Sequence, residues 1–217
     1  MKKYKALFTD LDGTLIQSVD GIYEALKVAF TKAGQEVPCK QDVIDMFGLP
    51  VELMLTTLTR VDKDDTATIE EFIAEYKRQY PIFMAKTPRI PNALETLQAI
   101  TGAGCPVYLI TSERRQNVQY VLEGVGLAPY IKDMVARDDV VHFKPHPEAL
   151  LRGLEKFGLK AEDCLYIGES PYDVEAGIAS GIFTVAVPSG GYSKQQLLDC
   201  HPDLCIDDIS ELTQYFI

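Results

Sequence analysis

The segment Ala6-Leu-Phe-Thr-Asp10-Leu-Asp-Gly-Thr14 passes from a short apolar run straight into a polar turn that carries two carboxylates. Short apolar, β-branched or aromatic runs bounded by turn residues are typical of buried strands in a parallel sheet. Three later segments have the same character: Pro106-Val-Tyr-Leu-Ile-Thr111, Cys164-Leu-Tyr-Ile167 and Phe183-Thr-Val-Ala-Val187. We therefore expect four buried strands, the first of which ends just before Asp10.

Segments of helical period separate these expected strands. They cover residues 92–101, which begin with the capping pair Asn92 and Glu95, then 113–125 before Gly126, and 147–157 before Gly158. Alternation of strand and helix predicts right-handed βαβ units. The fold class expected is α/β, with a Rossmann-like doubly wound and mostly parallel sheet.

One long stretch breaks this alternation. It has helical periodicity at residues 23–33, 51–59 and 68–80 and no convincing strand. We interpret residues 18–87 as an inserted α-helical cap subdomain, and residues 1–17 and 88–217 as the catalytic core. Residues 16–18 and the proline-marked segment 86–91 are the expected hinges.

Composition excludes several kinds of partner. With 217 residues, 47% of them apolar, the chain can bury a sizeable core. A formal net charge of −11 would repel a nucleic-acid backbone or an anionic membrane surface. No run approaches the ~20 apolar residues of a membrane span, and the apolar run near the start is too short for a signal peptide. Five scattered cysteines without a C-x-x-C pair indicate reduced thiols and a cytoplasmic location.

Polar residues follow the expected strands at their carboxyl ends, where an open α/β sheet binds its ligand. Asp10 and Asp12 follow the first strand, and Glu169 and Asp173 follow a later one. Four converging carboxylates suit a hard cation that prefers oxygen ligands, and Mg²⁺ is the expected ion. The alternative is that Asp10 and Asp12 only cap a turn before a helix.

Three further residues fit a phosphate site. Thr111 offers a hydroxyl and Ser112 a backbone N–H near a helix start, while Lys144 precedes Pro145 and another helix. Beside four carboxylates, Lys144 would balance charge and hold a phosphate oxygen. Taken alone, the Thr-Ser pair could be a helix cap and Lys144 an ordinary surface lysine.

The ordered set Asp10-x-Asp12-Gly-Thr14, Thr111, Lys144-Pro145-x-Pro147 and Gly168-Glu169-x-x-x-Asp173 resembles the four motifs of the haloacid dehalogenase superfamily. The resemblance covers essentially the whole chain. A helical insert soon after the first motif is similar to the cap of the subfamily that contains phosphoglycolate phosphatase, pyrophosphatase and β-phosphoglucomutase.

This resemblance implies a magnesium-dependent phosphatase of small phosphate monoesters. Asp10 would be the nucleophile, and Asp12 the general acid and base. Thr111, the Ser112 N–H and Lys144 would hold the phosphoryl oxygens. The metal would lie on the Asp10 carboxylate, the Asp12 backbone carbonyl and Glu169, with Asp173 supporting it through water or hydrogen bonds. Families of this type usually carry Asp at the position of Glu169, so metal affinity or preference is expected to differ.

The resemblance also suggests a role for the cap. Met46-Phe-Gly-Leu-Pro50 is similar in position to a substrate-specificity loop, so Phe47 and Gly48 would line the entrance. The alternative for Phe47 is a place in the core of the cap. The expected partner is a small phosphorylated metabolite, and the sequence leaves monomer or weak dimer open.

The sequence fits other functions less well. A β-phosphoglucomutase-like enzyme would be expected to carry a histidine in the first linker and a basic residue in the cap loop, where this chain has Ile22 and Tyr23, and Leu49-Pro-Val-Glu52. A signalling receiver domain is expected to have ~120 residues and no helical insert. A catalytically idle relative that binds a metabolite remains a further alternative.

Overall fold

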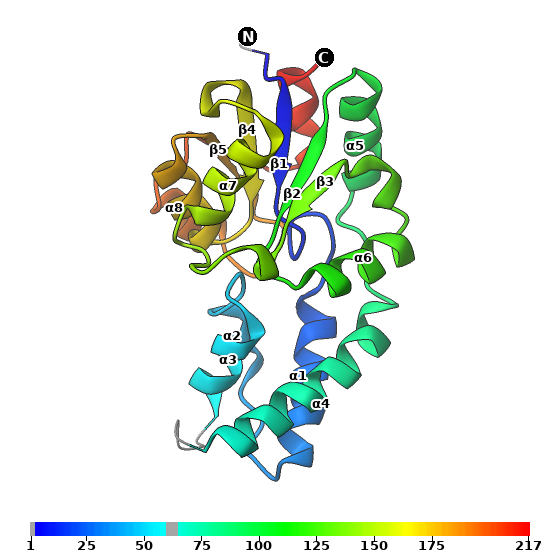
Figure 1. Ribbon diagram of the computed structural model, residues 1–217, viewed down its shortest axis with the longest axis vertical. Helices are drawn as coiled ribbons and strands as arrows, with labels where there is room; N and C mark the ends of the chain where they lie inside the picture. Colours follow the sequence, from blue (N-terminus) through cyan, green and yellow to red (C-terminus); the bar gives the residue numbers. More distant parts are fainter. Residues whose placement is uncertain (1–2, 60–64) are drawn as a thin grey trace.

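A six-stranded sheet, all of it parallel, forms the upper lobe of the molecule in the computed structural model, which describes residues 3–59 and 65–217 (Figure 1). The strand order is β3-β2-β1-β4-β5-β6, so the two carboxylates of the first motif follow a central strand. The strands are β1 Ala6–Thr9, β2 Val107–Ile110, β3 Asp133–Val135, β4 Cys164–Gly168, β5 Phe183–Ala186 and β6 Leu204–Cys205. The four strands predicted from the sequence are confirmed.

The two strands that the sequence did not reveal, β3 and β6, lie at the two edges of the sheet. They contain only three and two residues. Such short segments carry too few side chains for a recognisable apolar run, and each depends on its one neighbour for hydrogen bonds.

Each face of the sheet is buried by its own group of helices. On one face Phe8, Tyr108 and Tyr166 pack with α7 (Glu148–Phe157) and α8 (Pro171–Ser180). On the other face Leu7 and Leu109 belong to a cluster that includes α5 (Ala93–Gly102) and the 3-10 helix η4 (Ile209–Tyr215). Alternate residues of each strand point to opposite faces, so this sorting confirms the predicted doubly wound α/β fold. The remaining helices of the lobe are α6 Arg115–Gly124, α9 Lys194–Leu198, η1 Ala128–Tyr130, η2 Arg137–Asp139 and η3 Ala161–Asp163.

One local prediction was wrong. Asn92 precedes α5 as expected, but its backbone is left-handed (φ 62°) and its side chain makes no capping hydrogen bond. The Asn92 amide instead donates to Asp208 at 2.8 Å, a residue far away in the sequence. A tertiary contact has replaced the local capping pair.

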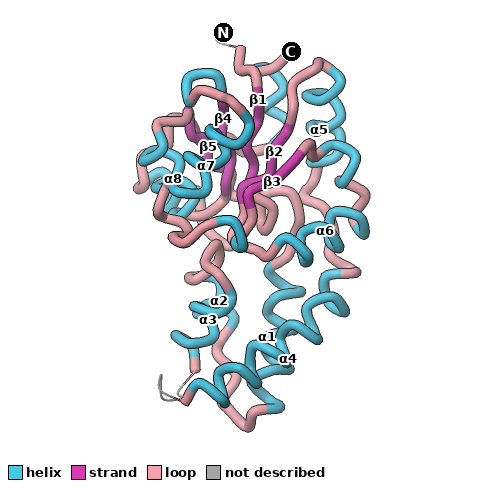
Figure 2. The backbone as a smooth tube through the Cα atoms, viewed as in Figure 1, coloured by secondary structure: helices cyan, strands magenta, loops and turns pink. Residues whose placement is uncertain are grey.

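The lower lobe contains only helices and loops among the described residues (Figure 2). Its helices are α1 Val19–Lys32, α2 Lys40–Ile44, α3 Val51–Leu58 and α4 Thr66–Met84. Helices α1 and α4 make the main contact, in which the rings of Phe30 and Phe72 lie 5.0 Å apart, edge to face. The sequence missed the short helix α2 and ended α4 at Tyr80, whereas the helix continues through Pro81.

The two segments that join the lobes run side by side. The Gln17 N–H donates to the Pro88 carbonyl at 2.8 Å, and Ile16 forms an antiparallel bridge with Arg89. We call residues 18–87 the cap, and this division remains a prediction. No described helix is both long enough and apolar enough to cross a membrane.

Candidate active site

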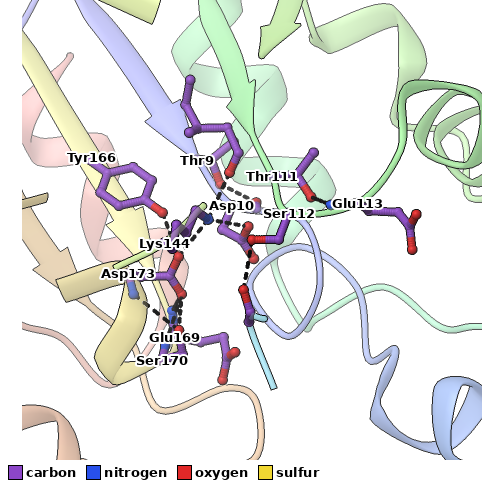
Figure 3. Close-up of polar contacts among 12 residues, drawn as sticks. Thr9, Asp10, Thr111, Ser112, Glu113, Lys144, Tyr166, Glu169, Ser170 and Asp173 are labelled. Carbon is purple, nitrogen blue, oxygen red and sulfur yellow. Dashed lines mark hydrogen bonds and ion pairs between the residues drawn. The ribbon is translucent and has the colours of Figure 1, made fainter. Parts of the chain in front are cut away.

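Figure 3 shows that six of the residues predicted from the four motifs come together at the carboxyl ends of the central strands, namely Asp10, Thr111, Ser112, Lys144, Glu169 and Asp173. Asp10 follows β1, Thr111 follows β2 and Glu169 follows β4. Lys144 approaches from the loop that precedes α7, and its peptide bond to Pro145 is cis. Parallel strands bring their ends to one edge of the sheet, which explains why segments distant in sequence meet here.

Lys144 is the centre of the cluster. Its ammonium nitrogen donates to Asp10 Oδ1 at 2.7 Å, to Asp173 Oδ1 at 2.7 Å and to the Ile110 carbonyl at 3.0 Å. Only 2% of the residue is exposed, so the alternative of a surface lysine is excluded. Burial opposes its charge, but attraction to Asp10 and Asp173 outweighs this and raises the pKa of Lys144.

Asp10 and Asp12 both face a cavity below the sheet. Burial raises the pKa of Asp10 to about 7, against the opposing attraction of Lys144. Burial also raises the pKa of Asp12 to about 7, with a further contribution from the nearby Glu113 carboxylate, while the Ser18 hydroxyl opposes the shift. The backbone turns sharply between them and Ile16, since Gly13 has φ 79° and its N–H donates to the Ile16 carbonyl at 2.8 Å.

Asp173 has hydrogen bonds to both of its carboxylate oxygens. Oδ1 accepts from Lys144 and from the Tyr166 hydroxyl at 2.6 Å, and Oδ2 accepts from the Ser170 hydroxyl at 2.6 Å and from the N–H groups of Glu169 and Ser170. Burial opposes the negative charge, but Lys144 outweighs it and lowers the pKa of Asp173. Ser170 and Asp173 also form a capping box at the start of α8. The aspartate is thereby held rigidly beside Lys144.

Glu169 differs from Asp173 in having little hydrogen bonding. It is fully buried, and neither carboxylate oxygen has a hydrogen-bond partner of normal geometry among the described residues. Burial and the charges of Asp173 and Asp10 raise the pKa of Glu169 well above the usual range, against the opposing effects of the Gly191 N–H and Lys144. Buried carboxylates without partners are costly, so this side chain fits a cation better than an unliganded state.

Two glycines make room for the longer glutamate. A Cβ at Gly13 would lie 2.8 Å from Glu169 Cδ, and a Cβ at Gly190 would lie 2.0 Å from Glu169 Oε2. The absence of both side chains explains how the chain accommodates one methylene more than the aspartate expected at this position. Gly190 was not identified from the sequence, because it lies outside the four motifs.

The donor set of the crevice suits a divalent cation. Both carboxylate oxygens of Glu169 are buried without a hydrogen bond among the described residues. Four carboxylates meet a single buried ammonium group among the described residues. Oxygen ligands and excess negative charge are what Mg²⁺ requires, so the residues present fit the ion implied by the resemblance.

Thr111 and Ser112 lie beside Asp10, and neither is the N-cap residue of α6, which is Arg114. The Thr111 hydroxyl accepts a hydrogen bond from the Glu113 N–H at 3.1 Å. The Ser112 hydroxyl donates to the Gly48 carbonyl at 2.7 Å, which joins the core to the cap.

Phe47 and Gly48 bring the cap loop into the crevice. Phe47 is 2% exposed, belongs to the hydrophobic cluster and also lines the cavity, so its two predicted alternatives coexist. Gly48 has φ 100°, and a Cβ there would lie 2.8 Å from the Ser170 hydroxyl oxygen. The Tyr192 hydroxyl donates to the carbonyls of Asp45 and Phe47, which fixes the same loop.

The cavity between cap and core has a volume of about 40 Å³. Its core side consists of Asp10, Asp12, Thr111, Ser112 and Glu113, and its cap side includes Ile22, Leu49, Val51, Met54 and Tyr76. The sequence did not identify Glu113 as a lining residue, because it was interpreted as the first residue of a helix.

The sequence profile of the haloacid dehalogenase-like hydrolases matches residues 7–187. The chain belongs to this family. A phosphoglycolate phosphatase of Rhodospirillum rubrum is 33% identical over 96% of this chain and 89% of its own length. The phosphoglycolate phosphatase of Escherichia coli K12 is 26% identical over 94% of this chain and 88% of its own length.

A solved structure shows the same fold as this haloacid dehalogenase-like hydrolase. A crystal structure of a member of the same family from Bacteroides fragilis superposes with a TM-score of 0.88 at 26% identity, covering 97% of this chain and 100% of that one. The four motifs identified in the sequence therefore lie in a fold that this chain shares with another member of the family.

Proposed function

We propose that this hydrolase is a phosphatase that cleaves small phosphate monoesters through a phosphorylated Asp10, in the manner of a phosphoglycolate phosphatase. The observation that carries the proposal is the buried ammonium of Lys144, held 2.7 Å from Asp10 beside a set of carboxylates. The two phosphoglycolate phosphatases at 33% and 26% identity support the phosphatase class.

In the first half of the proposed reaction, an oxygen of Asp10 attacks phosphorus and the bond from phosphorus to the ester oxygen breaks. Asp12 gives its proton to the departing oxygen, so that an alcohol leaves. The raised pKa of Asp12, about 7, favours a carboxyl group that still carries a proton near neutral pH.

In the second half, water attacks the phosphorus of phosphorylated Asp10. Asp12, now ionised, takes a proton from that water, and inorganic phosphate leaves as the Asp10 carboxylate is regenerated. A single carboxyl serves both halves because each half restores the protonation state that the other needs.

Lys144, Thr111 and the Ser112 N–H would hold the oxygens of the transferring group, and Asp173 would position Lys144. Phosphoryl transfer depends mainly on such positioning and on neutralisation of charge. The Asp10 carboxylate, the Asp12 backbone carbonyl and Glu169 would hold Mg²⁺, with Asp173 in support, and the ion would offset the negative charge of the phosphoryl group. Residues 18–87 would close over the core and exclude water.

The proposal also covers the substrate, the cellular compartment and the oligomeric state. The substrate would be a small phosphorylated metabolite, met in the cytoplasm by a monomer or weak dimer. Cys39, Cys105, Cys164, Cys200 and Cys205 are all free thiols, which fits a reducing compartment.

The test is phosphate release from a panel of esters, including phosphoglycolate, sugar phosphates, nucleotides and pyrophosphate, with Mg²⁺ or with chelator. We expect release that requires Mg²⁺ and that falls by about 10³-fold or more in Asp10→Asn. Release that is unchanged in Asp10→Asn would refute the proposed nucleophile. Transfer of phosphate between sugar phosphates, without release, would favour the mutase alternative.

A further inference from the structure

The cavity has two chemically different ends. Asp10 lies at one end, hydrogen-bonded to Lys144 behind it, and this is where the phosphate would be held. Figure 3 shows the Glu113 side chain extending away from this pair, on the far side of Thr111 and Ser112. A phosphate ester bound at Asp10 would therefore direct its alcohol portion toward the end where Glu113 lies.

Hydrogen bonds orient the Glu113 carboxyl group through one of its oxygens and leave the other oxygen available as an acceptor. Its Oε1 accepts from the Arg114 N–H at 2.6 Å and from the Asn117 amide at 3.0 Å. Its Oε2 accepts no hydrogen bond from any described residue. Burial raises the pKa of Glu113 to about 7, and its charge in turn acts on Asp12 and Tyr76. A partly buried carboxyl oriented in this way is suited to a donor group on a ligand.

No cation is available at this end of the cavity. Among the described residues that line it, none is a lysine, arginine or histidine. Arg114 is adjacent in sequence, but its guanidinium is engaged by Glu52 at 2.7 Å and by Asp138 at 3.1 Å. A carboxylate on the leaving alcohol would therefore approach the Glu113 carboxyl group without a counter-charge, and like charges brought together repel each other.

We propose that Glu113 is a specificity-determining residue that selects phosphate esters whose alcohol carries a hydrogen-bond donor, a hydroxyl or an ammonium group, and disfavours esters of hydroxy acids. This rests on the proposed function, and it separates this chain from relatives that are named for phosphoglycolate. The cavity is small in this structure, about 40 Å³, which favours a short alcohol.

A matched series of two-carbon esters tests the proposal in the native chain. The series consists of ethyl phosphate, 2-hydroxyethyl phosphate, 2-aminoethyl phosphate and phosphoglycolate, which differ only in the terminal group. We expect kcat/KM for the better of the hydroxyl and ammonium esters to exceed that for phosphoglycolate by about tenfold or more. The ranking of the hydroxyl ester against the ammonium ester identifies which donor the site takes.

Glu113→Gln tests the residue itself, because the amide keeps one acceptor and places a donor where Oε2 was. We expect the kcat/KM ratio of the donor ester to phosphoglycolate to fall by about tenfold or more, with a smaller change for ethyl phosphate. Glu123→Gln, an exposed position in α6, the helix that follows Glu113, is the matched control and should leave the ratio unchanged. Circular dichroism shows whether both variants fold. If Glu113→Gln does not fold, the ester series measured on the native chain still tests the proposed preference.

The possible failures are distinguishable. No release from any of the four esters would overturn the proposed function and this inference with it. Release with phosphoglycolate as the preferred ester would overturn the inference alone. A Glu113→Gln variant with the same ratio as Glu123→Gln would show that Glu113 does not set the preference.

Discussion

Asp10 in the core and Glu75 in the cap are equally inaccessible, with 7% of each side chain exposed, yet they are paired with cations in opposite ways. Lys144, the partner of Asp10, is itself only 3% exposed, whereas Lys32 and Arg78, the partners of Glu75, are 62% and 63% exposed. Burial raises the pKa of Asp10 to about 7, while hydrogen bonds from Lys32, Gln79 and Arg78 lower that of Glu75 to about 2.

The two carboxylates differ in whether their charge is balanced by neighbouring side chains. Around Glu75 several donors satisfy one carboxylate and the cations remain in water, so the arrangement is complete without a ligand. Around Asp10 one buried ammonium faces an excess of carboxylates, which leaves negative charge for a cation to neutralise. Core charges should therefore control both stability and reaction, and cap charges mainly stability.

The largest effect is expected from Lys144→Met. Removing the ammonium leaves Asp10 and Asp173 buried without their counter-charge, so the free energy of unfolding at pH 8 should fall by about 3–5 kcal/mol. Phosphate release should fall with it. Urea denaturation and a phosphate assay measure the two effects.

Lys156→Met is the matched control, since Lys156 pairs with Asp133 at 2.9 Å on the surface. Its loss should cost at most about 1 kcal/mol. Equal losses of stability in the two variants would contradict the contrast between buried and exposed cations.

A second prediction concerns the space around Glu169. In Gly190→Ala the new methyl group would overlap Glu169 Oε2, so the affinity for Mg²⁺ should fall by about 10–100-fold. Adding Glu169→Asp shortens the displaced side chain and should restore part of the affinity. Isothermal titration of Mg²⁺ into the protein without substrate provides the measurement, and a Gly190→Ala variant with native affinity would argue against Glu169 as a ligand.

The ion pair between Arg114 of the core and Glu52 of the cap should have a smaller effect. Its side chains are 43% and 27% exposed, so a double-mutant cycle with Arg114→Gln and Glu52→Gln should give a coupling energy of about 1 kcal/mol or less. The coupling should decrease with added salt. A coupling energy several times larger would contradict the small contribution expected of an ion pair that is partly exposed to solvent.

The smallest effect is expected from Glu75→Gln. The folded-state pKa of about 2 lies below the ordinary value of 4.5, so the ionised carboxylate stabilises the fold above pH 4.5 and loses this contribution as the pH falls toward 2. The variant should show a weaker decrease of stability over that acid range. Thermal melts at pH 2 to 6 measure it, and an unchanged pH dependence would exclude Glu75 as a contributor.

The sequence predicted the central strands and the strand-end residues because both are local patterns. Apolar runs marked β1, β2, β4 and β5, and the side chains that follow them must converge in a parallel sheet. The position of Lys144 among carboxylates followed from this convergence. The sequence did not reveal Glu113, because its place in the site depends on the shape of the cavity. It did not reveal Gly190 either, because that glycine matters only through the length of the Glu169 side chain. The capping role of Asn92 failed because Asp208 competes for its side chain.

The two ends of the described chain meet at the side of the sheet remote from the cap (Figure 1), where the Tyr4 N–H donates to the Tyr215 carbonyl at 3.0 Å. Ends that lie together at a surface are suited to tethering and to circular permutation. An attachment at either end would leave the entrance of the cavity facing the solution. Immobilisation for flow assays or single-molecule force measurements could thus use these ends without obstructing the substrate.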